Sequence, residues 1–305
     1  MRGLLLVCSA GVLWGTIGPG VALADDAGGV GVLTTGAYRA VVAVAALLLA
    51  VVVTGRWRRF VGQARPQWRR IVAVGLLTAS FQLLFFVSVP AAGVSVTVVV
   101  CLGLAPVLLL VTDAVRRARV PPAAQVLTVV VALVGLLLVA GPGNGATGSS
   151  PGWGVVGALA AGVAYAASAE VGGPLSRRLD TLTMTTATIG VAALALLPGG
   201  LLVPWVRGEP LGVGGPADRG FASYWLLVVY LGVVTMALAY ALLFAGLRTT
   251  SGSVAVVATL LEPATGVLIA TLLLGESLGL AGVAGTVLIL AAVGSLGLRR
   301  EPTPQ

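Results

Sequence analysis

Ten apolar stretches follow one another along the chain, from Leu4 to Leu298, with short connections between them. Each is about twenty residues long, which is the length a helix needs to cross the hydrocarbon core of a bilayer. Backbone polar groups that face lipid must be satisfied inside their own segment, and stretches of this kind achieve that as helices. Charged residues make up 9% of the chain, well below the ~25% of a soluble domain. The sequence therefore predicts an all-α polytopic membrane protein and excludes a water-soluble fold.

The limits of the apolar stretches give the expected helices. They are residues 4–24, 31–54, 70–89, 91–113 and 120–140, then 152–173, 182–206, 221–246, 252–274 and 277–298. A linker rich in Gly, Pro, Asn and Ser, residues 141–152, separates two groups of five. We therefore divide the chain into a first unit, 1–147, and a second unit, 148–305.

The two units resemble each other. Laying Gly75 on Gly232 without gaps also lays Thr78 on Thr235 and Pro106 on Pro263. Because each unit has an odd number of spans, the second enters the membrane upside down relative to the first. This is the inverted-repeat plan of many secondary transporters, which place their substrate near the midplane between the halves.

Arginines are concentrated in every second connection. Those on this side are Arg2, Arg56, Arg58, Arg59, Arg65, Arg69, Arg70, Arg116, Arg117, Arg119, Arg177, Arg178, Arg248, Arg299 and Arg300. Basic loops stay in the cytoplasm, so we expect both termini to be cytoplasmic, in the cell (inner or plasma) membrane. The net charge of +8 follows from this bias and does not indicate a nucleic-acid partner.

The first span has a second interpretation. Arg2, an apolar run and Ala22-Leu23-Ala24, which matches a small-x-small cleavage site, are typical of a cleaved signal peptide. Against cleavage, Trp14-Gly15 and Gly18-Pro19-Gly20 interrupt the apolar run, and removal of the span would break the five-plus-five arrangement. A retained first helix is therefore preferred.

Missing residue types exclude several chemistries. The chain has no histidine, which removes Ser-His hydrolases and His-ligated zinc or haem. It also has no lysine and no Gly-x-x-x-x-Gly-Lys loop, so the chain does not drive transport with ATP itself. We therefore expect no enzyme, no cofactor and no metal site.

Three side chains lie unusually deep in the predicted spans. At 1.5 Å per residue, Glu262 and Trp14 lie roughly 15 Å from the ends of their helices, and Arg39 roughly 12 Å. An ionised acid at such depth costs about 2.5 to 3.5 kcal/mol on insertion scales. An indole N–H there needs a partner or a cavity. A structural pair, or an Arg39 that reaches toward the surface, is the alternative to a substrate or proton site.

Other polar residues within the spans complete the candidate substrate-binding set. This set is Trp14, Tyr38, Arg39, Gln82, Tyr165, Tyr240 and Glu262. For the tyrosines and Gln82, a hydrogen bond between helices is the competing interpretation. Pro106 and Pro263 each lie in mid-span and are expected to kink their helices, because proline frees the carbonyl four residues earlier.

Short motifs place the chain in a family. They are Leu13-Trp14-Gly15-Thr16, Tyr38-Arg39, Phe85-Phe86, Gly93-Val94 and Pro106, then Gly246-Leu247-Arg248, Leu261-Glu262-Pro263 and Leu274-Gly275-Glu276. With them, the chain resembles the EamA-type transporters of the drug/metabolite transporter superfamily over essentially its full length. One departure is Ala164-Tyr165-Ala166 in the sixth span, where the family commonly has a tryptophan.

The resemblance implies a ten-helix carrier with cytoplasmic termini that moves small metabolites. We expect export of amino acids or amines by alternating access, with the lipid bilayer as surroundings and either a monomer or a homodimer as the assembly. If the cargo is zwitterionic, Arg39 would hold its carboxylate and Glu262 its ammonium or a proton. A multidrug or cation exporter is the nearer alternative, and a lipid-handling protein or flippase the more distant one.

Overall fold

A computed structural model gives the fold of the chain. It describes all residues except 28–29, 141–148, 209–210, 213–219, 275–278 and 299–305. Most of the predicted linker, the Gly275-Glu276 pair and the terminal arginines Arg299 and Arg300 therefore lie outside the described residues. Within the described residues every regular element is helical, and ten spans are long and apolar enough to cross a membrane. The predicted all-α, ten-helix class is confirmed.

The first five spans are built from seven α-helices and one short 3₁₀ turn. They are α1 (Arg2–Gly15), α2 (Ile17–Asp26), α3 (Val32–Val53), α4 (Trp57–Ala64), η1 (Arg65–Gln67), α5 (Trp68–Ala92), α6 (Val94–Arg117) and α7 (Ala123–Ala140). The short helix α4 was not expected from the sequence, since eight residues are too few to span.

The last five spans contain another seven α-helices and a π-helical segment. They are α8 (Pro151–Arg178), α9 (Thr181–Val206), α10 (Phe221–Tyr230), η2 (Leu231–Leu238), α11 (Ala239–Leu247), α12 (Gly252–Ala258), α13 (Leu261–Leu274) and α14 (Leu280–Leu298). The π-helical turns of η2 lie in the middle of the eighth span. Segments of this type are rare and often mark functional positions.

The first and ninth spans are broken. The sequence predicted a continuous helix for the first span and a single helix kinked at Pro263 for the ninth. The first divides at Thr16 into α1 and α2, and the ninth divides at Thr259 and Leu260 into α12 and α13. In each, a proline is the third residue of the second helix: Pro19 in α2 and Pro263 in α13. A helix leaves its first N–H groups without internal partners, so proline is tolerated there and not in a helix interior.

Pro106 behaves differently from Pro263. Helix α6 continues from Val94 to Arg117 with Pro106 inside it. A kink at Pro106 stays a prediction. In the ninth span the chain turns before the proline, and the Thr259 carbonyl accepts the Glu262 N–H at 2.9 Å.

The two broken spans lie against each other. A Cβ atom added at Gly15 would come within 2.5 Å of Thr265 Cβ and 2.6 Å of the Glu262 carbonyl oxygen. One added at Gly11 would come within 3.2 Å of Thr259 Cα. Only glycine permits this approach, so the break in the first span is held directly against the break in the ninth.

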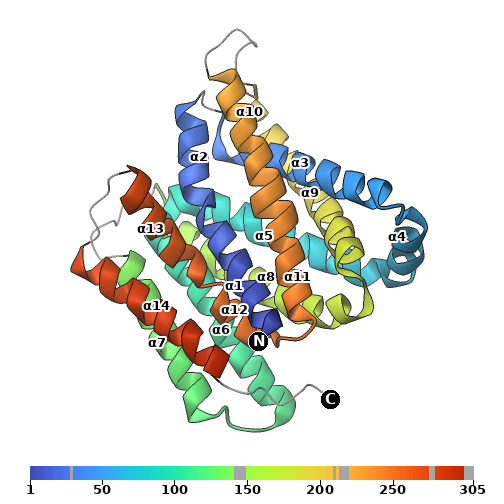
Figure 1. The fold of residues 1–305 in the computed structure, drawn as a ribbon. Coiled ribbons are helices and arrows are strands. Elements are labelled where there is room, and N and C mark those ends of the chain that lie inside the picture. Colours follow the sequence, from blue (N-terminus) through green and yellow to red (C-terminus); the bar gives the residue numbers. More distant parts are fainter. Residues whose placement is uncertain (28–29, 141–148, 209–210, 213–219, 275–278, 299–305) are drawn as a thin grey trace.

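The helices of the two halves are interleaved rather than separate (Figure 1). The main pairs across the halves are α5 with α8, α1 with α11, α6 with α8, α1 with α13, α5 with α9, α3 with η2, α3 with α9, and α7 with α14. Helix α4 lies at one edge of the bundle, beyond the end of α3 (Figure 1). The cavity described below lies among these interleaved helices.

Polar contacts join the halves at the end of the bundle that carries Arg59, Arg116 and Arg248, which we call the basic side. Arg59 pairs with Asp180 at 3.4 Å, and Arg116 pairs with Glu170. Asp180 also caps α9 by accepting the Thr183 N–H. Asp113 accepts a hydrogen bond of 2.9 Å from the Ser253 hydroxyl. Glu170 and Asp113, which lie near the ends of their spans, therefore each have a partner in the other half.

Candidate functional site

A cavity lies between the two halves, with about 550 Å³ of empty space when its opening to the surroundings is counted. Its lining comes from eight elements: Trp14 of α1, Ile17 of α2, Arg39 of α3, Phe81, Gln82, Phe85 and Phe86 of α5, Tyr165 of α8, Thr235 of η2, Tyr240 of α11 and Glu262 of α13. Aromatic rings form most of the wall, and one cation and one carboxylate are the charged members of this lining. A mostly apolar pocket with a few convergent polar groups is the usual form of a small-molecule site.

Six of the seven candidate substrate-binding residues line this cavity. They are Trp14, Arg39, Gln82, Tyr165, Tyr240 and Glu262. Tyr38 does not. The centres of the Tyr38 and Trp225 rings are 5.4 Å apart, and the Tyr38 hydroxyl donates to the Leu211 carbonyl. Both contacts lie on the side opposite the basic side.

Arg39 is buried with most of its hydrogen-bonding capacity unused. Its side chain is 5% exposed, and Nη2 donates to Gln82 Oε1 at 2.6 Å. Its Cζ atom lies 5.5 Å from the centre of the Phe86 ring. Among the described residues, Nε and Nη1 of Arg39 and Nε2 of Gln82 have no acceptor. Unpaired buried donors are costly, so the arginine and the glutamine are both able to bind an acceptor that the described part of the chain does not supply.

Glu262 faces the same cavity from the start of α13. The break before α13 allows the chain to turn here, and Pro263 fixes the first turn after it. Among the described residues the ion pairs are Arg59–Asp180 and Arg116–Glu170, so Glu262 makes no contact pair with Arg39. Both side chains nevertheless line the same cavity. Opposite charges that share a cavity without touching can each bind a different group of one ligand.

Trp14 is fixed by the π-helical segment. Its Nε1–H donates to the Thr235 carbonyl at 2.9 Å, and its ring meets the edge of Tyr240 at 5.1 Å. The wider turn of η2 places Thr235 at the cavity wall. The indole expected to need a partner at this depth has found one on another helix.

Tyr165 links the wall of the cavity to the broken ninth span. Its hydroxyl shares a hydrogen bond of 2.7 Å with Thr259 Oγ1, and its ring stacks on Phe81 at 5.0 Å. The residue that replaces the family's common tryptophan therefore still lines the site. Its hydrogen bond reaches the residue at which α12 ends.

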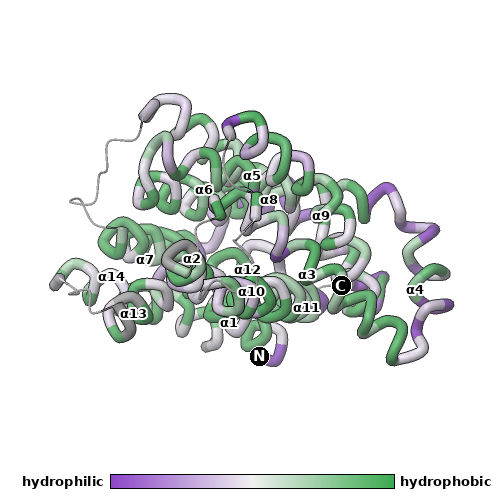
Figure 2. The backbone as a smooth tube through the Cα atoms, turned by 90° about the horizontal axis from the view of Figure 1, so that it is seen from above, coloured by the Kyte–Doolittle hydropathy of each residue, from purple (hydrophilic) through white to green (hydrophobic). Residues whose placement is uncertain are grey.

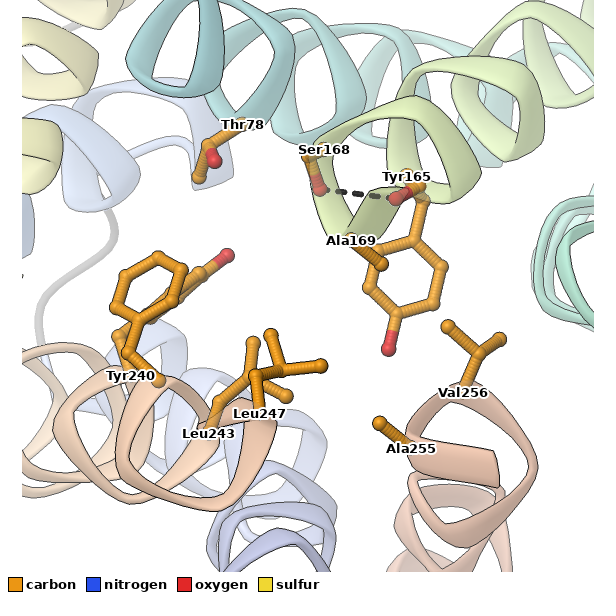
Figure 3. Close-up of a pocket in the computed structure, with 10 residues that line it drawn as sticks. Thr78, Tyr165, Ser168, Ala169, Tyr240, Leu243, Leu247, Ala255 and Val256 are labelled. Carbon is orange, nitrogen blue, oxygen red and sulfur yellow. Dashed lines mark hydrogen bonds between the residues drawn. The ribbon is translucent and has the colours of Figure 1, made fainter. Parts of the chain in front are cut away.

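A second, much narrower cavity adjoins the first (Figure 3). It is lined by Thr78, Tyr165, Ser168, Ala169, Tyr240, Leu243, Phe244, Leu247, Ala255 and Val256. Tyr165 and Tyr240 line both cavities, and Figure 3 shows them on opposite sides of the open space. Leu247 is the last residue of α11, at the basic side, and Ala255 lies in α12, which begins at that side, so the second cavity lies between the first one and the basic side.

The sequence did not single out the phenylalanine wall of α5 as part of the site. Phe81, Phe85 and Phe86 lie at positions −1, +3 and +4 relative to Gln82. Positions three and four apart share one face of a helix. If the face of α5 that carries Gln82 had been taken to line the cavity, the same spacing would have predicted that these phenylalanine rings line it too.

Known proteins match the chain over nearly its whole length. The model of the EamA-like transporter family matches residues 1–141 and 152–297. An uncharacterized transporter of Bacillus subtilis (strain 168), YwfM, is 26% identical over 303 residues, which cover 99% of this chain and 95% of that protein.

A crystal structure of another protein, 19% identical, superposes with a TM-score of 0.76 over 97% of this chain and 96% of that one. At this identity the match supports the fold alone. The family match covers both halves of the chain and agrees with the ten apolar helices. The chain belongs to the EamA-like transporter family and is a polytopic membrane transporter, not an enzyme.

Proposed function

We propose that the protein is a secondary carrier that exports small metabolites, with zwitterionic amino acids as the leading class and simple amines as the next. The observation that carries this proposal is the pair of charges on one cavity. Arg39 has two nitrogens without an acceptor, and Glu262 faces the same space without pairing to it. A molecule with a carboxylate and an ammonium group complements both.

Each charged group has a defined role in this proposal. The planar guanidinium of Arg39 suits bidentate binding of a carboxylate. The Gln82 side-chain oxygen accepts a hydrogen bond from Arg39 Nη2, and the unpaired Nε2 of Gln82 is a further donor for the ligand. Glu262 accepts the ammonium group or exchanges a proton. The rings of Trp14 and Tyr240 cover the rest of the ligand.

The proposed mechanism is alternating access by two inverted repeats, 1–147 and 148–305. The helix pairs support this arrangement, since each main pair has a counterpart with the halves exchanged: α5 with α8 corresponds to α11 with α1, and α5 with α9 to η2 with α3. Gly75 and Gly232, equivalent by sequence, both permit close contact, with Thr188 and Val191 of α9 and with Arg39 and Val42 of α3. Rocking of one half against the other would expose the cavity to each side in turn.

Export requires an orientation, which the arginines provide. We place the basic side in the cytoplasm, with both termini there. Reporters fused after Arg59 and Arg117 should then read as cytoplasmic, and one at Asn144 as external. A cytoplasmic signal at Asn144 would contradict this topology.

The substrate class can be tested with purified protein in liposomes. We would measure exchange of a neutral amino acid in competition with two analogues, the amine that lacks its carboxylate and the acid that lacks its ammonium. The proposal expects the amino acid to compete best and Arg39→Gln to remove the preference over the amine. Equal competition by all three, or an unchanged preference in Arg39→Gln, would contradict it.

The same assay separates the nearest alternative. A multidrug or cation exporter should be inhibited by bulky organic cations more strongly than by amino acids. The buried positive charge of Arg39 disfavours such ligands. Strong inhibition by bulky cations with none by amino acids would replace our proposal with that function.

A further inference from the structure

Helix α4 has the pattern of a helix that lies in a membrane surface. Its apolar residues Trp57, Phe60, Val61 and Ala64 follow the i, i+3, i+4, i+7 spacing of a single helical face. Arg58 and the polar remainder of the helix occupy the other face. Purple and green alternate along α4 at the edge of the bundle in Figure 2. A short helix of this kind binds by its apolar face at the boundary between headgroups and acyl chains.

The apolar face of α4 is left partly uncovered by the described part of the protein, since Phe60 and Ala64 are half-buried and Trp57 and Val61 are exposed. The helix packs against α9, η1 and the end of α3. Trp57 is nevertheless 51% exposed and Val61 44% exposed, and Trp68 at the start of α5 is 57% exposed. Two indoles at the same edge are typical of the interfacial zone of a bilayer, where an amphipathic ring meets both lipid and water.

Arginines surround this face. Arg56, Arg58, Arg65, Arg69 and Arg70 are exposed, and Arg69 lies over the Trp68 ring at 5.5 Å. The sixth, Arg59, is directed to Asp180. The stretch from Arg56 to Arg70 contains no acidic residue. The stretch therefore offers these exposed cations no acidic partner of its own.

We propose that residues 57–70 form a binding site for the headgroup phosphates of anionic phospholipids in the leaflet at the basic side. Trp57, Phe60 and Val61 enter the acyl boundary, and the arginines contact phosphate oxygens, for which the guanidinium fork is well suited. Clusters of several arginines beside a transmembrane helix attract anionic lipid in this way. The site is separate from the cavity and does not depend on which substrate is carried.

Lipid selectivity of the full-length protein tests the proposal. Protein would be placed in nanodiscs of phosphatidylglycerol and phosphatidylethanolamine with identical acyl chains, and the lipids that remain bound would be counted by native mass spectrometry. We expect enrichment of phosphatidylglycerol, which falls severalfold in the double variant Arg58→Gln, Arg65→Gln. The matched control is Arg117→Gln, Arg119→Gln, which removes two exposed charges from the same side and should keep the enrichment.

Equal loss in both double variants would overturn the proposal, because it would assign the selectivity to overall charge. Absence of enrichment in the wild type would overturn it as well. Both results can be judged without transport, so failure here leaves the proposed function intact.

A depth measurement tests the geometry separately. Spin labels would be placed at Val61→Cys and at Gly62→Cys in a background without Cys8 and Cys101, in vesicles that contain phosphatidylglycerol. We expect the label at residue 61 to be more accessible to oxygen and the label at residue 62 to be more accessible to a water-soluble nickel complex. Equal access of the nickel complex to both would show that α4 stands in water and would overturn the proposal.

Discussion

The fourth and ninth spans hold matching places in the two halves, yet they differ in backbone and in chemistry. The alignment that lays Pro106 on Pro263 also lays Ala105 on Glu262. Helix α6 runs through its proline, and Ala105 is completely buried. The ninth span is broken before its proline, and Glu262 faces the cavity. In this alignment the acidic group and the helix break therefore occur together, at the same place, and only in the second half.

The comparison indicates that the helix break before Pro263 and the carboxylate of Glu262 depend on each other. A continuous helix would use the backbone groups around Thr259 in its own hydrogen bonds. The break instead leaves Thr259 bonded to Glu262 through its carbonyl and to Tyr165 through its hydroxyl. Irregular backbone at membrane depth is tolerated where it is enclosed by protein or lines a cavity, and here it does so.

The largest effect is expected from Glu262→Gln. If Glu262 gains and loses a proton during transport, the amide fixes it in an uncharged form. Flux driven by a pH gradient should then fall to the level of protein-free liposomes, while substrate exchange continues. Both fluxes would be measured in proteoliposomes at equal protein content.

Glu170→Gln is the matched control for this change, because Glu170 pairs with Arg116 at the basic side and lies outside the cavity. It should keep its driven flux. Undiminished driven flux in Glu262→Gln would assign the carboxylate to helix packing and remove its coupling role.

The contact between the two broken spans can be disturbed by Gly15→Ala. The new methyl would lie 2.5 Å from Thr265 Cβ and 2.6 Å from the Glu262 carbonyl oxygen, so the spans must separate. Overpacking of this kind costs about 1 to 3 kcal/mol of unfolding free energy. The readout is the thermal unfolding midpoint in detergent. Gly18→Ala, which meets nothing within 4 Å, is the control, and an equal shift in both variants would contradict the close contact.

Replacement of the two prolines tests the ninth span against the fourth. Pro263→Ala supplies the missing N–H and favours one continuous helix, because proline disfavours that form by roughly 3 kcal/mol. The alanine variant therefore stabilises the continuous form relative to the broken one. If about half of the proline's penalty is removed, we expect transport to fall by about tenfold. Pro106→Ala changes a helix that is already continuous and should have a smaller effect. Equal losses would mean that the break is not what distinguishes the two spans.

The smallest effect is expected from Tyr165→Phe. This change removes the hydroxyl bonded to Thr259 beside the break and leaves the ring in place. Hydrogen bonds between membrane helices are worth about 0.6 kcal/mol on average, so the unfolding free energy should fall by about that amount. Tyr240→Phe keeps this bond and serves as the reference. A larger loss in the reference would place the important hydroxyl on Tyr240.

Much of this fold could be predicted because the bilayer restricts what an apolar stretch can do. All ten spans were found at nearly their observed limits. The break in the first span was missed, because hydropathy is unaffected by a helix interruption. In the ninth span Pro263 indicated a kink, but not that the helix divides in two before it. Pro19 was read only as evidence against a signal peptide, although it stands in α2 as Pro263 stands in α13.

The sequence predicts how deep a side chain lies in its span, but not the direction in which it points from the helix. Tyr38 and Arg39 are neighbours at similar depth, but consecutive residues on a helix point about 100° apart at 3.6 residues per turn. Arg39 therefore faces the cavity, whereas Tyr38 packs on Trp225. Helix α4 escaped notice for another reason, since its arginines had already been explained by topology.

The two charges that share the cavity have an electrical consequence. With Glu262 ionised, the cation and the carboxylate in the lining sum to zero, and a bound zwitterion leaves that sum unchanged. Membrane voltage does work only on net charge that moves, about 2.3 kcal/mol per charge for each 100 mV. Reorientation of this site, empty or filled, would then proceed at the same rate at any voltage. Only the addition of a proton to Glu262 would let the membrane potential act on the cycle.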